Sequence, residues 1–209
     1  MKEFLLNTVL AKLQLRAPLT ALRSFKVLEH DYGHFRSARK WQSVDRHNNP
    51  IPWLTYPAID YLNTLDLSEC RIFEYGAGNS TLYWEKVAKS VVSIESNPKW
   101  FKKISRQLTS GEIYLQEDLE QYPDEILERG TLDIVLIDGA VRPECVKQAV
   151  KKTKSLIILD NSQEFPESRE FLRSQGFKEI VFTGFSPIVN FISITSFFIG
   201  DFIPKFKKD

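Results

Sequence analysis

Residues 73–81 read FEYGAGNST. An apolar start passes into two glycines separated by one residue, and then into a polar run that ends in Ser80 and Thr81. Glycine lets a backbone turn tightly and approach a ligand closely, and serine or threonine can cap the helix that follows. The stretch therefore predicts a strand, a ligand-binding turn around Gly76 and Gly78, and a helix.

Seven short runs rich in Ile, Val, Leu or Phe lie along the chain, and amphipathic stretches separate most of them. Nearly continuous apolar runs, such as residues 156–159, are typical of strands covered on both faces. The alternation predicts an α/β fold, with a doubly wound, mostly parallel seven-stranded sheet. Only a short turn separates the last two runs, so we expect an antiparallel C-terminal strand. The predicted strands are residues 71–75, 90–95, 112–116, 132–138, 155–160, 179–183 and 192–199.

The first quarter of the chain differs in character from the rest. We expect residues 1–52 to form an N-terminal helical extension or lid. Residues 53–209 are expected to form a Rossmann-like domain. Apolar residues recur at helical spacing over residues 5–13, and we expect Pro18 to end that helix. A second helix is expected over residues 19–28. A polar segment up to Pro50 then has the composition of a loop.

The composition excludes several classes of protein. No run approaches the roughly 18 apolar residues of a membrane span, and a net charge of +1 steers the 209-residue chain toward neither nucleic acid nor membrane. Residues 1–50 nevertheless hold nine Lys or Arg against four Asp or Glu. We interpret this basic segment as a solvated helical face, and the alternative is contact with an acidic partner or a membrane surface. The two cysteines match no metal spacing, and we expect a cytoplasmic protein.

Acidic residues stand at the ends of four predicted strands, namely Glu74, Glu95, Asp138 and Asp160. Ligands of such sheets bind at the carboxyl ends of the strands. Glu95 ends the second strand, 21 residues after Glu74, where a carboxylate accepts hydrogen bonds from both ribose hydroxyls of an adenosine. The glycine turn lacks the third glycine of the dinucleotide fingerprint, which counts against an NAD(P)-dependent oxidoreductase.

These features resemble class I S-adenosylmethionine-dependent methyltransferases: the turn at residues 73–81, the strand ending at Glu95, and the sequence LIDG at residues 136–139. The resemblance covers about residues 53–199. It implies S-adenosyl-L-methionine as cofactor, with the ribose at Glu95, the adenine near Asp118 and the methionine portion along the turn. The cofactor-binding residues that it implies are Glu74, Gly76, Gly78, Ser80, Thr81, Glu95, Asp118 and Asp138.

A narrower resemblance is to catechol- and caffeoyl-type O-methyltransferases, which place an aspartate and an Asp-Asn pair at two strand ends to bind a divalent cation. Asp138 and the pair Asp160 and Asn161 stand at those two ends here, so the resemblance implies a metal site that suits Mg²⁺. The alternative is that Asp138 only touches the cofactor and that the pair only turns the chain. We name Asp138 and Arg142 as the catalytic candidates. Arg142 could pair with an anionic acceptor, and the alternative is an arginine on the surface.

The resulting hypothesis is O-methylation of a small molecule or sugar, without nucleic acid as a partner. Two rivals are an NAD(P)-dependent oxidoreductase and a module that binds S-adenosylmethionine without catalysis; a nucleic-acid methyltransferase is disfavoured because no N-P-P-Y-type motif follows the fourth strand. Trp53 and Tyr56 are expected in the core, with stacking on a ligand as the alternative. His30 and His34 have the spacing of metal ligands on a helix, but a third ligand is not evident.

Overall fold

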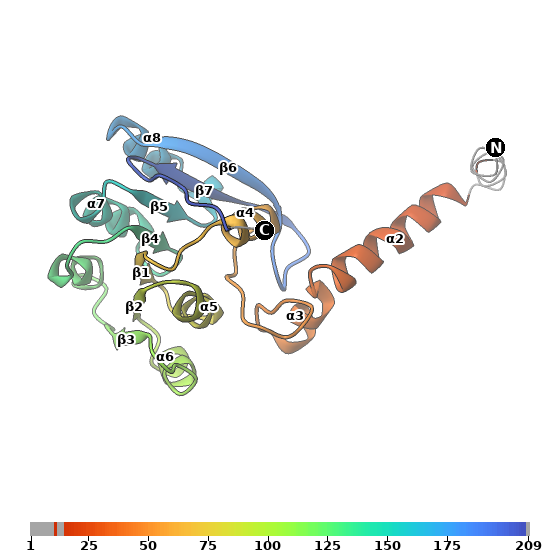
Figure 1. The fold of residues 1–209 in the computed structure, drawn as a ribbon, viewed down its shortest axis with the longest axis horizontal. Helices are drawn as coiled ribbons and strands as arrows, with labels where there is room; N and C mark the ends of the chain where they lie inside the picture. Colours follow the sequence, from red (N-terminus) through yellow and green to blue (C-terminus); the bar gives the residue numbers. More distant parts are fainter. Residues whose placement is uncertain (1–10, 12–14, 208–209) are drawn as a thin grey trace.

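The computed structural model of the protein describes residue 11 and residues 15–207. Its centre is a seven-stranded sheet with the strand order β3-β2-β1-β4-β5-β7-β6 (Figure 1). The first five strands run parallel, and β7 is antiparallel to both of its neighbours. The predicted fold class is therefore confirmed, including the antiparallel C-terminal strand. The strands are β1 (Arg71–Tyr75), β2 (Ser90–Glu95), β3 (Glu112–Leu115), β4 (Ile134–Ile137), β5 (Leu156–Leu159), β6 (Lys178–Phe185) and β7 (Ile192–Ile199).

Both faces of the sheet are covered, because successive side chains of a strand point to opposite faces. On β4, Leu136 belongs to a core cluster with α4 (Tyr56–Thr64) and α5 (Asn79–Val87). Its neighbours Val135 and Ile137 belong to a second cluster, which packs against helices of the other face. Every residue of β4 and β5 is buried, which explains their unbroken apolar sequences. The helices of the second cluster are η1 (Tyr122–Glu128), α7 (Arg142–Lys152) and α8 (Pro166–Ser174).

The order in which strands are added to the sheet reverses at β1. From β1 it continues to β2 and then, through α6 (Pro98–Ser105), to β3, whereas β4 lies on the other side of β1. Such a reversal of strand order opens a crevice at the carboxyl ends of the two central strands. The tips of β1, β2, β4 and β5 therefore border one edge of the sheet.

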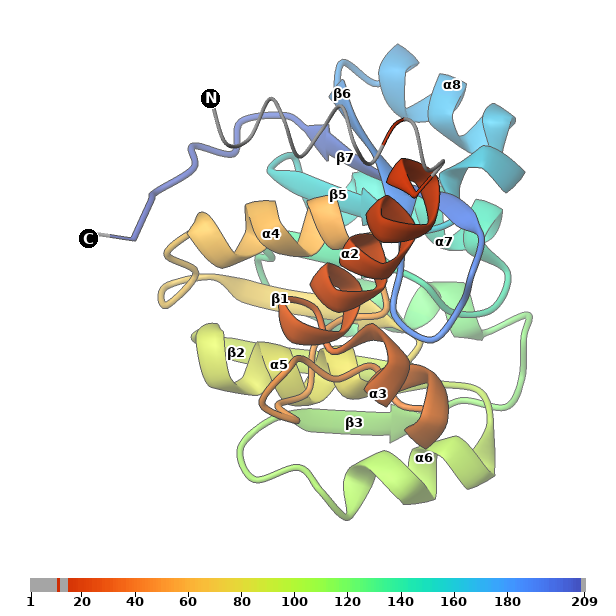
Figure 2. The ribbon, with the colours of Figure 1, turned by 90° about the vertical axis from the view of Figure 1, so that its right-hand side faces the viewer.

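The N-terminal part contains α2 (Arg16–His30) and α3 (His34–Lys40). None of the residues of α2 is buried, and the helix extends away from the sheet (Figure 1). In Figure 2, which is viewed from that side, α2 lies in front of the sheet. Residues 41–55 then return to the sheet, where the backbone N–H of Thr55 donates to Oγ1 of Thr195 at 3.0 Å. No helix in the described part of the chain is both long and apolar enough to cross a membrane.

Two expectations for this part were wrong in detail. Pro18 is the third residue of α2, because a proline is tolerated in a first turn, whose N–H groups have no partner within the helix. The segment expected to be loop contains α3. Gly33 precedes this helix and Trp41 follows it, and both residues have left-handed backbone conformations. The helix expected over residues 5–13 lies outside the described residues, apart from residue 11.

Because both faces of the sheet are covered, we expect the stability of the fold to depend strongly on the apolar side chains of its central strands. Leu136→Ala is expected to lower the free energy of unfolding by about 2–5 kcal/mol, because it leaves a cavity between α4, α5 and β4. Urea denaturation followed by circular dichroism measures this loss. Leu119→Ala is the matched control, since Leu119 is 47% exposed and should change stability little. Similar losses in the two variants would contradict the packing described.

Candidate functional site

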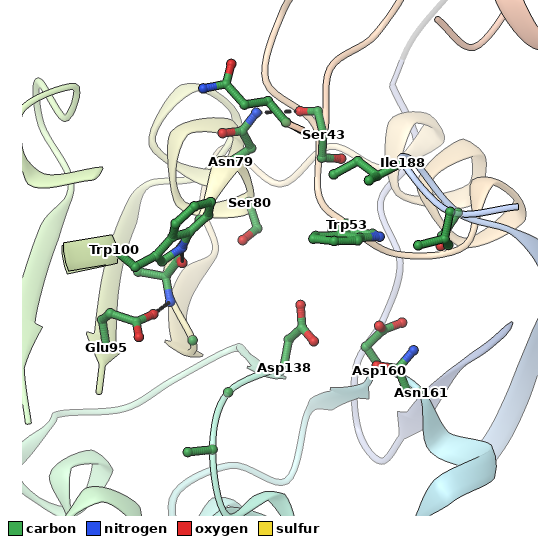
Figure 3. Close-up of a pocket in the computed structure, with 18 of the residues that line it drawn as sticks. Ser43, Trp53, Asn79, Ser80, Glu95, Trp100, Asp138, Asp160, Asn161 and Ile188 are labelled. Carbon is green, nitrogen blue, oxygen red and sulfur yellow. Dashed lines mark hydrogen bonds between the residues drawn. The ribbon is translucent and has the colours of Figure 1, made fainter. Parts of the chain in front are cut away.

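A cavity of about 490 Å³ lies at the tips of β1, β2, β4 and β5 (Figure 3). This volume is in the range of sites that enclose a small organic ligand. One side of the cavity is formed by the turns that follow the parallel strands. The other side is formed by residues 41–43, Trp53 and the loop between β6 and β7.

The glycine turn lies directly against the turn that follows β4. Gly76 has a φ of +91°, and a Cβ on it would stand 2.7 Å from the Cα of Gly139. Any side chain here would therefore push the two turns apart. The backbone N–H of Gly76 donates to the carbonyl of Ile94, and that of Gly78 donates to Oγ1 of Thr81, so the turn is tied to β2 and to α5.

Glu74 lies beneath this turn and not in the cavity. Its Oε2 accepts hydrogen bonds from the hydroxyls of Thr81 and Ser93, both at 2.5 Å. The side chain is fully buried, and Oε1 has no hydrogen-bond partner. Burial raises the pKa of Glu74 to about 7, against the opposing effect of the hydroxyl groups. Glu74 and Thr81 thus support the turn from below.

Glu95 lines the cavity at the tip of β2. Its Oε2 accepts from the backbone N–H of Ala77 at 3.0 Å, and its Oε1 accepts from that of Asn97 at 2.7 Å. Burial raises the pKa of this carboxyl, and the backbone N–H groups act in the opposite direction. Each carboxylate oxygen can accept more than one hydrogen bond, so the fixed side chain can still bind a pair of hydroxyls in the cavity.

Arg142 joins the tips of β4 and β5 through five hydrogen bonds. Nε donates to the carbonyl of Gly139 at 3.1 Å. Nη1 donates to the carbonyl of Asp160 at 2.6 Å and to Oδ1 of Asn161 at 3.1 Å. Nη2 donates to the carbonyl of Asp138 at 3.0 Å and to its Oδ1 at 2.8 Å. A guanidinium has five N–H donors, so these contacts occupy all of them.

Asp160 is held from the other side by a chain of two hydrogen bonds. Oγ1 of Thr195 donates to Oδ1 of Asp160 at 2.6 Å while it accepts from the backbone N–H of Thr55. Burial raises the pKa of Asp160, and the nearby carboxylate of Asp138 raises it further. Burial also raises the pKa of Asp138, but the guanidinium of Arg142 acts against it. Asp160 is therefore an oriented carboxyl at the cavity wall with an increased affinity for a proton.

The wall opposite these carboxyls comes from segments distant in sequence. The side-chain amide of Asn79 donates to the carbonyl of Ser43 at 2.6 Å, which fixes residues 41–43 against the start of α5. Trp53 lines the cavity and meets Trp41 edge to face, with their ring centroids 6.0 Å apart. Ile188 also lines the cavity, with a φ of +78° that is strained for a β-branched residue. Strained backbone of this kind is characteristic of ligand-binding loops.

The structure brings most of the predicted site residues together. Those that line the cavity are Gly76, Gly78, Ser80, Glu95, Asp138, Arg142, Asp160 and Asn161. Glu74 and Thr81, which were also expected to bind the cofactor, are buried beneath the turn and do not line the cavity. Asp118 is exposed outside the cavity, where its carboxylate accepts from the backbone N–H of Glu120. The expectation that placed Trp53 in the core is wrong, whereas Tyr56 is buried as expected.

Several lining residues escaped the sequence analysis. Trp100 donates from Nε1 to the carbonyl of Ala77, and Ile188 and Phe191 reach the cavity from the β6–β7 loop. The sequence Asn97-Pro98 is typical of a helix start, and this helix closely follows Glu95. That signal could have placed Trp100, in the first turn of the helix, next to the cavity. Nothing local in residues 186–191 indicates that they fold over the tips of distant strands.

The residues proposed for metal binding have other partners. Nδ1 of His34 lies 3.2 Å from the hydroxyl of Tyr56, so His34 belongs to the core beneath α4. Within the described residues, no group of three or more His, Cys, Asp or Glu is arranged to hold a metal ion. The oxygens of Asp138 and Asn161 that the narrower resemblance assigns to a cation accept N–H groups of Arg142 instead.

No family model matches the chain, and no curated protein sequence matches it. Among solved structures, it is similar to a precorrin-6y C5,15-methyltransferase from Geobacter metallireducens, with 16% identity, a TM-score of 0.54, and coverage of 68% of this chain and 86% of the other. An rRNA methylase from Streptococcus thermophilus has 16% identity, a TM-score of 0.50, and coverage of 68% and 92%. A precorrin 8W decarboxylase from Methanobacterium thermoautotrophicum has 17% identity, a TM-score of 0.50, and coverage of 68% and 88%. These similarities show the class I methyltransferase fold.

The buried Glu74 predicts that the protein loses stability as the pH rises. The folded carboxyl, with its pKa near 7, keeps a proton that the unfolded carboxyl, with an ordinary pKa of 4.5, has already released. Between these values the unfolded state binds fewer protons, so the free energy of unfolding falls with increasing pH. Denaturation between about pH 5 and pH 8 should show this slope, reduced in Glu74→Gln. Glu117→Gln, at an exposed position, should keep the wild-type slope; an unchanged slope in Glu74→Gln would contradict the assignment.

Proposed function

We propose that this chain, which has the class I methyltransferase fold, binds S-adenosylmethionine and transfers its methyl group to a small-molecule acceptor. The observation that carries the proposal is Glu95, held by two backbone N–H groups at the tip of β2 and facing a cavity beside the glycine turn. A carboxylate at this position suits the two ribose hydroxyls of an adenosine.

The residues around Glu95 fit the remainder of such a cofactor. Gly76 and Gly78 leave the turn without side chains, so that a ligand can approach the backbone. Trp100 and Ser96 border the cavity next to Glu95, where they would contact the nucleoside, and Asp138 and Gly139 border it next to the turn. When bound, S-adenosylmethionine supplies a methyl group that already carries positive sulfonium character.

The protein therefore has to align an acceptor, exclude water and accept a proton. We assign the proton to Asp160, whose burial favours its protonated form. As the new oxygen–carbon bond forms and the sulfur–carbon bond breaks, the hydroxyl proton of the acceptor passes to this carboxylate. Alignment of the two reactants can contribute about 7–11 kcal/mol to lowering the barrier. We therefore favour an oxygen acceptor on a small molecule or sugar.

The residues at the tips of β4 and β5 do not fit a divalent cation. Arg142 already places a positive charge between Asp138 and Asn161 and uses all five of its donors there. We assign Arg142 a positioning role, which holds the tips of β4 and β5 at a fixed separation. The same engagement makes it unavailable for an anionic acceptor, and a lining with four carboxyl groups (Glu95, Asp138, Asp160 and Glu164) disfavours a phosphate-rich nucleic acid.

Glu95→Ala tests the cofactor assignment. The variant should bind S-adenosylmethionine about 10- to 150-fold more weakly, since each charge-assisted hydrogen bond contributes roughly 1.5–3 kcal/mol. Isothermal titration calorimetry measures the affinity, and a thermal melt shows whether the variant folds. Glu112→Ala, on the exposed side of β3, is the matched control and should bind as the wild type does. Unchanged affinity in Glu95→Ala, or wild-type binding of NADH in place of S-adenosylmethionine, would refute the proposal.

Titration with Mn²⁺, followed by electron paramagnetic resonance, tests the role of Arg142. The wild-type protein should show no tightly bound Mn²⁺ at the tips of β4 and β5, because the guanidinium occupies the ligand oxygens. One equivalent of tight binding that disappears in Asp160→Asn would show that a cation displaces Arg142. Glu167→Gln, on the exposed face of α8, controls for adventitious binding to surface carboxylates.

A further inference from the structure

We propose that the half of the cavity under Trp53 is the acceptor site, and that the acceptor is an uncharged, flat molecule that packs on the indole and presents a hydroxyl to Asp160. This inference rests on the proposed function, because it takes the half beside Glu95 as the cofactor's. It goes further in defining the shape and charge of the acceptor.

Trp53 lies opposite the carboxyls at the strand tips. Figure 3 shows its ring edge-on across the open space from Asp138 and Asp160. A flat face is thus turned toward the carboxyl that we assign as the proton acceptor. Trp41 contacts this ring edge to face, which limits the ways in which the indole can turn. A flat ligand can therefore stack on Trp53 while its edge reaches the strand tips.

Apolar side chains also lie on this side of the cavity. Ile188, Val189 and Phe191 line the cavity from the β6–β7 loop. Phe191 is 57% exposed and Trp41 is 63% exposed, although both border the cavity. Exposed aromatic side chains at the border of a cavity favour contact with an apolar ligand surface.

Charge excludes an anionic acceptor. Arg142 is the one Lys or Arg among the described residues that line the cavity, and its five donors are engaged. Asp138, Asp160 and Glu164 also line the cavity. A carboxylate, sulfonate or phosphate on the acceptor would have no free cation to pair with, and it would be repelled by these acids.

Asp160 offers a polar contact to the acceptor. Thr195 occupies Oδ1 of Asp160, and the carbonyl oxygen of Asp160 accepts from Arg142. The second carboxylate oxygen is the atom to which a hydroxyl in the cavity can donate. This arrangement sets the orientation: the ring lies against Trp53, and the hydroxyl points to the tip of β5.

Binding of matched probes tests the inference. Calorimetric titrations with saturating S-adenosylhomocysteine would compare naphthol, which is flat and neutral, with naphthoate, which is flat and anionic, and with cyclohexanol, which is neutral but not flat. We expect saturable binding of naphthol, and binding at least about tenfold weaker for the other two. Trp53→Ala should weaken naphthol binding about tenfold, and Trp53→Phe should largely preserve it, because the ring is retained. Phe206→Ala removes an exposed aromatic from the C-terminal segment that pairs with Leu65 and should leave naphthol binding unchanged.

The outcomes separate this inference from the proposed function. If the wild type does not bind S-adenosylhomocysteine, the proposed function fails. If it does, but naphthol fails to bind, naphthoate binds as tightly, or Trp53→Ala leaves naphthol affinity unchanged, only the acceptor inference is overturned. A loss of S-adenosylhomocysteine affinity in Trp53→Ala would also overturn it, because Trp53 would then serve the cofactor half; Trp53→Phe distinguishes this case from misfolding.

Discussion

Two turns lie backbone against backbone at the centre of the molecule, the one after β1 and the one after β4. Gly76 cannot carry a side chain without meeting Gly139, so the crevice between the diverging halves of the sheet begins at this contact. Glu74 supports the turn from below through Thr81, and Glu95 holds it from the side through the N–H of Ala77. A buried, proton-binding carboxyl and a cavity-lining one thus serve the same turn in different ways.

Electrostatics on the other side of the crevice depend on one side chain. Arg142 donates hydrogen bonds to oxygens at the tips of β4 and β5, and its positive charge offsets the negative charge of Asp138. In a metal-dependent site a cation would have to bind the same oxygens. The guanidinium is engaged there, so no Lys or Arg among the described residues that line the cavity has a free donor for a ligand.

The successes and failures of the sequence analysis follow from the range of the contacts involved. Gly76, Gly78 and Glu95 were expected near the carboxyl ends of the strands, and they line the cavity because strand ends in a parallel sheet meet at one side. Asp118 follows the edge strand β3, which has a neighbouring strand on one side only, and it lies outside the cavity. Trp53 was assigned to the core because an aromatic residue before a helix is usually buried, and its position at the cavity depends on residues far along the chain.

The sequence by itself determined the alternation of strands and helices, the glycine turn and the acidic strand ends, because periodicity and backbone preference act over a few residues. Tertiary structure alone decided which carboxyls face the cavity, what Arg142 binds and which residues form the wall around Trp53. Thr55 and Thr195 are 140 residues apart, yet their contact orients Asp160. Such contacts form only when the sheet is assembled, so no local pattern specifies them.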